Sequence, residues 1–126
     1  MMTDSNTQRV FTALDHIDPA ATKTLKSVFR DEDLTAIVEW INPGETFEDP
    51  HSHPESAHVF VVVSGEGDAL VGHGKWETMK AGDFVVNPRH KVHAMRNKST
   101  SERFVWVCVH ITNGPHVTDE RTEDAE

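Results

Sequence analysis

Histidine is the residue type whose number and spacing in this sequence point most directly to chemistry. The chain has 126 residues and nine histidines, two of which form the pair His51-Ser52-His53. Residues two apart in an extended segment face the same side, so both imidazoles can converge on one point. Neutral imidazole is the commonest metal ligand, and such a pair makes an efficient clamp. Taken alone, the pair is also compatible with two solvated histidines beside a turn.

Two further histidines lie where a fold could bring them to this pair. His58 begins a predicted strand five residues after His53, and His93 lies on another predicted strand 35 residues further on. His93 can lie beside the first histidines only if the sheet closes on itself. The elements between them therefore decide whether a site forms.

The elements that must position these histidines are short segments rich in β-branched and aromatic residues. Turn signals such as Asn42-Pro43-Gly44 and Gly72-His73-Gly74 separate them. They predict strands over residues 35–41, 58–63, 68–71, 75–79, 84–86, 92–97 and 104–111. Short strands at this spacing are typical of an all-β sandwich or barrel.

The segments at the two ends have a different character. Asp18-Pro19 predicts the start of a short helix, which Leu25, Val28 and Phe29 continue at helix-like spacing. The last ten residues are acidic and lack apolar residues to bury. The chain is thus divided into an N-terminal extension (1–34), one barrel domain (35–115) and an acidic flexible tail (116–126).

Composition excludes several classes of protein. Lys and Arg number 12 against 21 Asp and Glu, which gives a net charge of −9 and argues against nucleic-acid and anionic-membrane binding. The single cysteine, Cys108, excludes an intramolecular disulfide and a cysteine-based zinc knuckle, and it suits a reducing compartment. No apolar run is long enough to span a bilayer, and the N-terminus lacks the features of a secretory signal. We therefore expect a cytoplasmic, single-domain protein.

The histidines lie within a frame of glycines and prolines that resembles the cupin superfamily. Its first motif, G-x5-H-x-H-x3/4-E-x6-G, is matched by Gly44, His51, His53, His58 and Gly65. Its second motif, G-x5-P-x-G-x2-H-x3-N, is matched by Gly82, Pro88, His93 and Asn97. The resemblance implies a double-stranded β-helix (jelly-roll) barrel that holds one divalent metal ion and commonly forms a homodimer.

The sequence departs from these motifs at three points. Six residues rather than five separate Gly44 from His51, His58 occupies the position of the family's glutamate ligand, and His90 replaces its turn glycine. The ligand set that the resemblance implies is therefore His51, His53, His58 and His93. All-histidine sites of this kind occur in small bacterial cupins that hold manganese or iron, with zinc, nickel and copper as further options.

Such a ligand set has chemical consequences. Four neutral imidazoles leave the +2 charge of the ion uncompensated, which favours an anionic substrate at its two open positions. The set also lacks the carboxylate of the facial triad in 2-oxoglutarate oxygenases. Three classes of function fit: a dioxygenase-like oxidoreductase that includes C–C cleavage, which we favour, a non-oxidative lyase, isomerase or cyclase, and a non-catalytic binding domain. Fold alone does not separate them.

Strand alternation predicts which other residues face the ion. With His58 and His93 inward, their strands also turn inward Phe60, Val62, Met95 and Asn97. On the last strand Phe104, Trp106 and Cys108 share a face, and we assign this face to the cavity. The predicted substrate pocket therefore consists of Phe60, Val62, Met95, Phe104, Trp106 and Cys108, although plain core packing is the simpler explanation than a catalytic role for the residues of the last strand.

The remaining residues of note have structural roles by default. Five histidines fall outside the motif positions and are assigned to turns, the tail or the wall: His16, His73, His90, His110 and His116. Of these, His110 shares a strand face with Cys108 and can line the cavity. The opposite face of that strand is an apolar stripe, which predicts either a dimer interface or packing within the domain: Val105, Val107, Val109 and Ile111.

Overall fold

The computed structural model describes residues 8–21, 24–45, 50–72 and 74–111. In these ranges the chain forms one short 3-10 helix, η1 (Ala13–His16), and eight strands. The strands are β1 (Leu25–Arg30), β2 (Leu34–Ile41), β3 (Ala57–Ser64), β4 (Glu66–Val71), β5 (Trp76–Lys80), β6 (Phe84–Asn87), β7 (His93–Arg96) and β8 (Phe104–Ile111). The predicted all-β class is confirmed, and every predicted strand is present. No helix in the described residues is long and apolar enough to cross a membrane.

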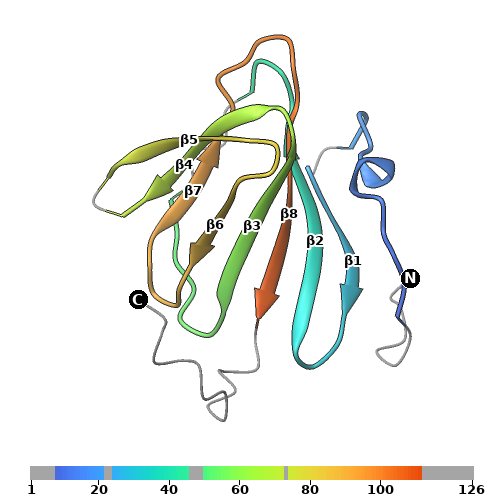
Figure 1. Ribbon diagram of the computed structural model, residues 1–126, viewed down its shortest axis with the longest axis vertical. Helices are drawn as coiled ribbons and strands as arrows, with labels where there is room; N and C mark the ends of the chain where they lie inside the picture. Colours follow the sequence, from blue (N-terminus) through green and yellow to red (C-terminus); the bar gives the residue numbers. More distant parts are fainter. Residues whose placement is uncertain (1–7, 22–23, 46–49, 73, 112–126) are drawn as a thin grey trace.

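The strands form two antiparallel sheets that face each other (Figure 1). One sheet has five strands in the order β1-β2-β8-β3-β6, and the other has three in the order β5-β4-β7. A single residue joins β3 to β4. Gly65 between β3 and β4 has a φ of 81° and lies against the backbone of Arg103, so a side chain would fit there neither conformationally nor sterically.

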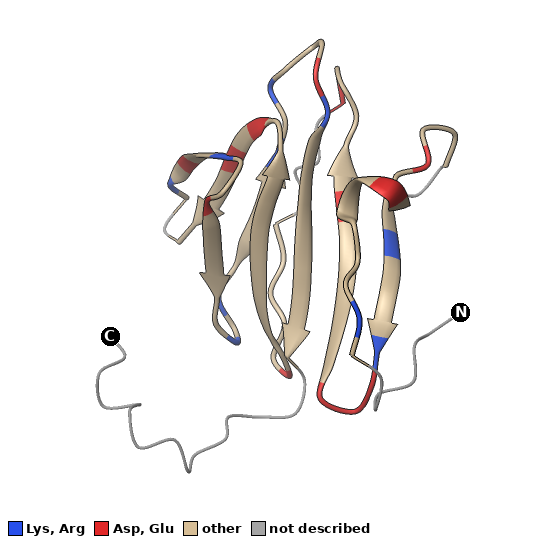
Figure 2. Cartoon of the chain, turned by 45° about the vertical axis from the view of Figure 1, so that its right-hand side comes forward, with Lys and Arg blue, Asp and Glu red and all other residues tan. Residues whose placement is uncertain are grey.

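The main hydrophobic core lies between the two sheets, because both contribute to it. Its buried residues are Ile37, Ile41, Phe60, Val62, Ala69, Met79, Met95, Phe104, Trp106 and Cys108. The predicted inward face of the last strand is thus confirmed. Acidic and basic residues lie mainly in turns and on edge strands, and the central strands of the large sheet are largely free of them (Figure 2).

A second, smaller core covers part of the outer face of the large sheet. Val38, Trp40 and Val105 are buried there beneath the N-terminal segment, to which Phe11 and Ile17 belong. The valine stripe of β8 is therefore divided: Val105 is buried within the chain, whereas Ile111 is exposed. Packing within the domain, one of the two roles expected for this stripe, is therefore confirmed for Val105.

The prediction of a helix that begins at Asp18-Pro19 is wrong. Asp18 instead accepts a hydrogen bond from the backbone N–H of Ala20 at 3.0 Å, which closes a turn. Residues Leu25–Arg30 form edge strand β1, paired with β2 from Leu25 opposite Glu39 to Arg30 opposite Thr35. Part of the expected N-terminal extension thus belongs to the large sheet. The acidic tail, residues 116–126, lies outside the described residues.

The motif residue Asn97 holds the loop that follows β7. Its Nδ2 donates to the carbonyl oxygens of Ile41 at 3.1 Å and Glu102 at 2.9 Å, and its Oδ1 accepts from the N–H of Ser99 at 3.0 Å. A buried amide that satisfies three backbone groups fixes the loop between β7 and β8. Asn97 therefore acts as a structural clamp at this end of the barrel.

Candidate metal centre

The pair His51 and His53 lies beside β7 as an extension of the small sheet. His51 and His93 exchange two backbone hydrogen bonds, His51 N to His93 O at 3.1 Å and His93 N to His51 O at 2.9 Å. This bridge places His93 beside the pair, which we expected from the sequence only if the sheet closes on itself. The turn before β7 is tied to the same segment, because His90 donates its N–H to the carbonyl of His53 at 3.0 Å.

His58 and His110 enter the site from the opposite sheet. They are direct partners across β3 and β8. Their rings stack with centroids 3.7 Å apart and an interplanar angle of 15°. The ring of His58 also lies 4.0 Å from that of His53, centroid to centroid. Both sheets therefore contribute imidazoles to one cluster.

The four predicted ligands converge. The ligand atoms of His51, His53 and His93 all lie within 4.8 Å of one another. The ring of His58 lies 5.3 Å from that of His93. A fifth imidazole, His110, joins them, with its ring 6.0 Å from that of His53. We call these five residues the histidine cluster: His51, His53, His58, His93 and His110. The binding of a metal by these residues stays a prediction.

The hydrogen bonds of the cluster leave nitrogen lone pairs available. His93 Nδ1 lies 3.0 Å from the carbonyl oxygen of Lys91. A carbonyl can only accept, so Nδ1 carries the proton and Nε2 keeps its lone pair. Among the described residues, the buried Nε2 atoms of both His53 and His93 have no hydrogen-bond partner. Because buried polar atoms are normally satisfied, two orphaned nitrogens in one cluster fit a bound cation.

Electrostatics keeps these imidazoles neutral. Burial lowers the pKa of His58 to about 3, helped by repulsion from His110, His53, His93 and His51. Burial likewise lowers the pKa of His110 to about 4, with repulsion from His53 and His93. Burial followed by repulsion from His51 lowers the pKa of His53. Burial lowers the pKa of His93 too, against the hydrogen bond to Lys91. At neutral pH, His53, His58, His93 and His110 are therefore in the neutral form that binds a metal.

A second donor group adjoins the first. His58, Cys108 and His110 also place one ligand atom each within 4.8 Å of the others. Cys108 is 0% exposed, and burial together with the nearby charge of Glu39 raises the pKa of its thiol. Sequence reasoning assigned His110 to the wall by default, with lining of the cavity as the alternative, and left it out of the ligand set. Its signal was the strand face that it shares with Cys108.

Sequence reasoning missed one acidic residue, Glu39. The indole Nε1 of Trp106 donates to Glu39 Oε1 at 2.7 Å, and both residues lie on the inner face of the large sheet. Burial raises the pKa of the Glu39 carboxyl, while the Trp106 hydrogen bond and the charge of His51 lower it. The available signal was a single acid at an inward position between Ile37 and Ile41.

The six residues predicted to line the substrate pocket all lie in the main core, and none is more than 5% exposed: Phe60, Val62, Met95, Phe104, Trp106 and Cys108. The rings of Phe60 and His93 are in edge-to-face contact, with their centroids 5.6 Å apart, so the core adjoins the histidine cluster directly. Trp106 also lines a small cavity of about 80 Å³ together with Glu39 and Ile41. The role of these residues in substrate binding stays a prediction.

The other histidines lie away from the cluster or outside the described residues. His90 has a φ of 71°, so it keeps the left-handed turn at which the cupin motif has glycine. His16 ends η1 on the N-terminal segment. His73 and His116 lie outside the described residues.

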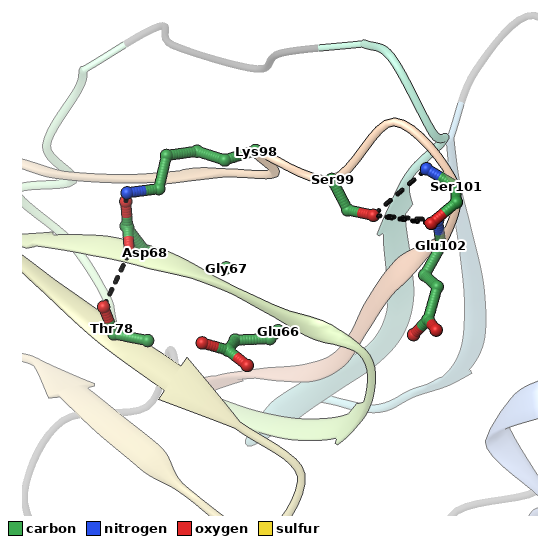
Figure 3. Close-up of a pocket in the computed structure, with 8 residues that line it drawn as sticks. All are labelled: Glu66, Gly67, Asp68, Thr78, Lys98, Ser99, Ser101 and Glu102. Carbon is green, nitrogen blue, oxygen red and sulfur yellow. Dashed lines mark hydrogen bonds and ion pairs between the residues drawn. The ribbon is translucent and has the colours of Figure 1, made fainter.

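A polar pocket of about 380 Å³ opens next to the start of β4 (Figure 3). At its base, the buried Asp68 accepts hydrogen bonds from Arg96 Nε at 2.9 Å and Thr78 Oγ1 at 3.1 Å, and it lies 3.1 Å from Lys98 Nζ. Burial alone would raise the pKa of Asp68, but these partners outweigh it and lower the pKa. The carboxylate is thus fully engaged in joining β4 to Thr78 of β5, Arg96 of β7 and Lys98.

Comparison with known proteins places this fold and site in context. The sequence pattern described as Cupin domain matches residues 38–110. Comparison with curated proteins gives no match. Among solved structures, an uncharacterized conserved protein with a double-stranded β-helix domain from Klebsiella pneumoniae is 26% identical, with a TM-score of 0.74 over 86% of this chain and 93% of that one.

Two more distant structures share the fold. A cupin superfamily protein from Desulfitobacterium hafniense is 13% identical, with a TM-score of 0.69 over 90% of this chain and 99% of that one. The DMSP lyase DddQ from Ruegeria pomeroyi is 20% identical, with a TM-score of 0.60 over 71% of this chain and 46% of that one. At these identities the likeness extends to the double-stranded β-helix alone.

Proposed function

This chain belongs to the cupin family, and we propose that it is a metal-dependent enzyme acting on a small organic substrate. One observation carries the proposal: the barrel gathers neutral imidazoles around two buried nitrogens, His53 Nε2 and His93 Nε2, that have no partner among the described residues. Such an arrangement costs stability unless a bound group, such as a cation, satisfies the two nitrogens. Structural packing gives no reason to place five histidines together at one end of a core.

We assign the ion to His51, His53 and His93, with His58 as the fourth ligand. A manganese or iron ion would supply redox chemistry and a net positive charge for an anionic substrate. The chain's own contribution is orientation. The Lys91 carbonyl fixes the tautomer of His93, and Ser56 Oγ lies 2.9 Å from His58 Nε2 and holds that ring. These outer contacts set the direction of the lone pairs before any ion binds.

The surroundings favour oxidation by dioxygen, including oxidative C–C cleavage, as the reaction class. The cluster borders on the apolar core on one side, since Phe60 is in ring contact with both His58 and His93. Such an apolar wall limits the access of water to that side of the centre, which suits reactive oxygen chemistry. The neutral ligand set suits a substrate that brings its own negative charge.

One observation favours a second candidate, a non-oxidative lyase, isomerase or cyclase. Glu39 is a partly buried carboxyl with a raised pKa, held by Trp106 on the inner face. A group of this kind can hold a proton for transfer, which is the element that acid–base chemistry requires and oxidation does not.

Turnover with and without oxygen tests the proposal. The purified protein, loaded with manganese or iron, is incubated with a panel of small carboxylates and enolisable ketones in air and under nitrogen. Loss of substrate coupled to oxygen uptake supports the oxygenase, and equal turnover under nitrogen supports the second candidate. His93→Ala is the inactive control, and His16→Ala, whose histidine lies on η1, is the matched active control. Binding of a panel compound without any turnover would contradict an enzymatic role.

A further inference from the structure

The donor group at the β3–β8 boundary differs in chemistry from the group formed by His51, His53 and His93. It contains two imidazoles and a thiol, contributed by His58, Cys108 and His110. Cys108 and His110 are two residues apart on β8 and face the same way, while His58 is the direct cross-strand partner of His110. Three donors on two hydrogen-bonded strands are held rigidly, because the register of the large sheet fixes their spacing.

His58 stands between the two groups. Its ring centroid lies 3.7 Å from that of His110 and 4.0 Å from that of His53. Ser56 Oγ contacts its Nε2 at 2.9 Å, so the hydroxyl can orient the ring and leaves Nδ1 as its second donor atom. Contacts of this sort commonly orient a metal-bound histidine. His58 is therefore available to either donor group.

The two donor groups have different softness. Three imidazoles accept manganese, iron and most other divalent ions, whereas a thiolate selects thiophilic ions such as zinc and copper. We propose that His58, Cys108 and His110 form a second metal-binding subsite, selective for thiophilic divalent ions, beside the site of His51, His53 and His93. The inference goes beyond the proposed function, because it concerns which ions the barrel accepts and not the reaction.

Burial supports this assignment. Cys108 is 0% exposed and His58 is 2% exposed, so water has little access to these two donors, and His110 is partly buried. The ion would displace the thiol proton, since only the thiolate is a ligand. Spacing is compatible as well: donors bound to one ion at about 2.0–2.3 Å lie within about 4.6 Å of each other, close to the separation in this group.

Cobalt substitution tests the subsite with a direct spectroscopic signature. Co²⁺ replaces zinc in sulfur-containing sites and gives an intense near-ultraviolet absorption from thiolate-to-cobalt charge transfer. Because Cys108 is the sole cysteine of the chain, any such band reports on this residue alone. We expect the metal-free wild-type protein to develop the band on titration with Co²⁺, and X-ray absorption to place one sulfur in the cobalt shell.

Variants separate the two donor groups. Cys108→Ser should lose the band, and His110→Ala should weaken the Co²⁺ affinity associated with it at least tenfold. His93→Ala, which breaks the other group, should keep the band, and His16→Ala is the matched control. Manganese binding should survive in Cys108→Ser, so failure of the subsite is distinguishable from failure of the proposed function.

Two results would overturn the inference. One is cobalt-loaded wild-type protein with neither a charge-transfer band nor a sulfur neighbour, which needs no variant and so does not depend on the folding of Cys108→Ser. The other is a band whose Co²⁺ affinity is unchanged in both His110→Ala and His58→Ala, which would mean that the thiol binds without these imidazoles.

Discussion

The inner face of the large sheet has two ends of opposite character. At one end, cross-strand neighbours on β2, β8 and β3 are Thr35, His110 and His58. Towards the other end, the corresponding positions on β8 are Trp106 and Phe104, which are buried among aliphatic side chains. The same backbone and the same alternation thus carry a polar cluster at one end and an apolar core at the other.

The difference teaches how the barrel divides stability from chemistry. The apolar end buries large side chains and supplies the hydrophobic contribution to folding. The histidine end gathers imidazoles whose protonation is suppressed by burial and mutual repulsion, and it leaves two nitrogens unpaired. Without an ion, this end contributes little to stability and can oppose it.

The largest effect on stability should come from the apolar end. Phe104 is 0% exposed, and Phe104→Ala should reduce the free energy of unfolding of the metal-free protein by about 3–5 kcal/mol through lost burial and a cavity. Urea denaturation measures this change. The matched variant at the other end, His51→Ala, should change it by less than about 1 kcal/mol. Equal losses at the two ends would contradict the division.

A smaller effect is expected at Asp68, the buried carboxylate of the polar pocket. The Asp68 side chain is 4% exposed and bonded to Arg96, so Asp68→Asn should cost about 1–3 kcal/mol in free energy of unfolding at neutral pH. Its lowered pKa means that this contribution is present above the unfolded value near 3.8 and is lost as the pH falls towards the folded value. Urea denaturation at pH 7 and pH 3 should show the variant's deficit shrinking at low pH. A constant deficit would show that the charge of Asp68 is not what matters.

The histidine end should make stability depend on pH in a different window. In the unfolded chain His58 titrates near 6.5, but in the folded protein its pKa is about 3, and that of His110 is about 4. Between these values the unfolded state binds more protons, so stability falls as the pH drops below 6.5. Each imidazole adds a slope of at most about 1.4 kcal/mol per pH unit.

Parallel melts of metal-free and metal-loaded protein between pH 4 and 7 measure this dependence. Protons compete with the ion, so the loaded protein should fall more steeply and the two curves should converge on acidification. His58→Gln should flatten the curve of the metal-free protein. Curves that stay a constant distance apart would show that the histidines do not hold the ion.

The smallest effect concerns association. Val107 and Val109 are only half-buried on the outer face of β8, next to the part that the N-terminal segment covers. We propose that a second copy covers this uncovered part and gives a homodimer. Sedimentation at micromolar concentration should show the dimer, and a monomer there would remove the idea.

Much of the difference between the two ends could be predicted from local sequence patterns. Alternation along residues 104–111 gave the inward face of Phe104, Trp106 and Cys108, because side chains in a strand alternate strictly. The motif spacing brought His51, His53 and His93 together. Both inferences depend on residues close in sequence or on positions that the cupin motifs already relate.

What could not be predicted depends on pairing between distant segments. The stack of His110 on His58 follows from the β3–β8 register, which no local spacing encodes. Leu25, Val28 and Phe29 have helical spacing, yet pairing with β2 and burial of Val28 beside Trp40 make this segment a strand. Tertiary context overrode local propensity there. The partnership of Glu39 with Trp106 likewise requires the β2–β8 register.

Titration of the metal-free protein with Mn²⁺ tests the central claim most directly, namely that the histidine cluster holds a metal ion. Calorimetry should give one ion per chain for the wild-type protein and for His16→Ala. In His53→Ala and His93→Ala the affinity should fall more than about 100-fold, because the loss of a ligand exceeds the loss of an outer partner. Wild-type affinity in both of these variants would contradict the account.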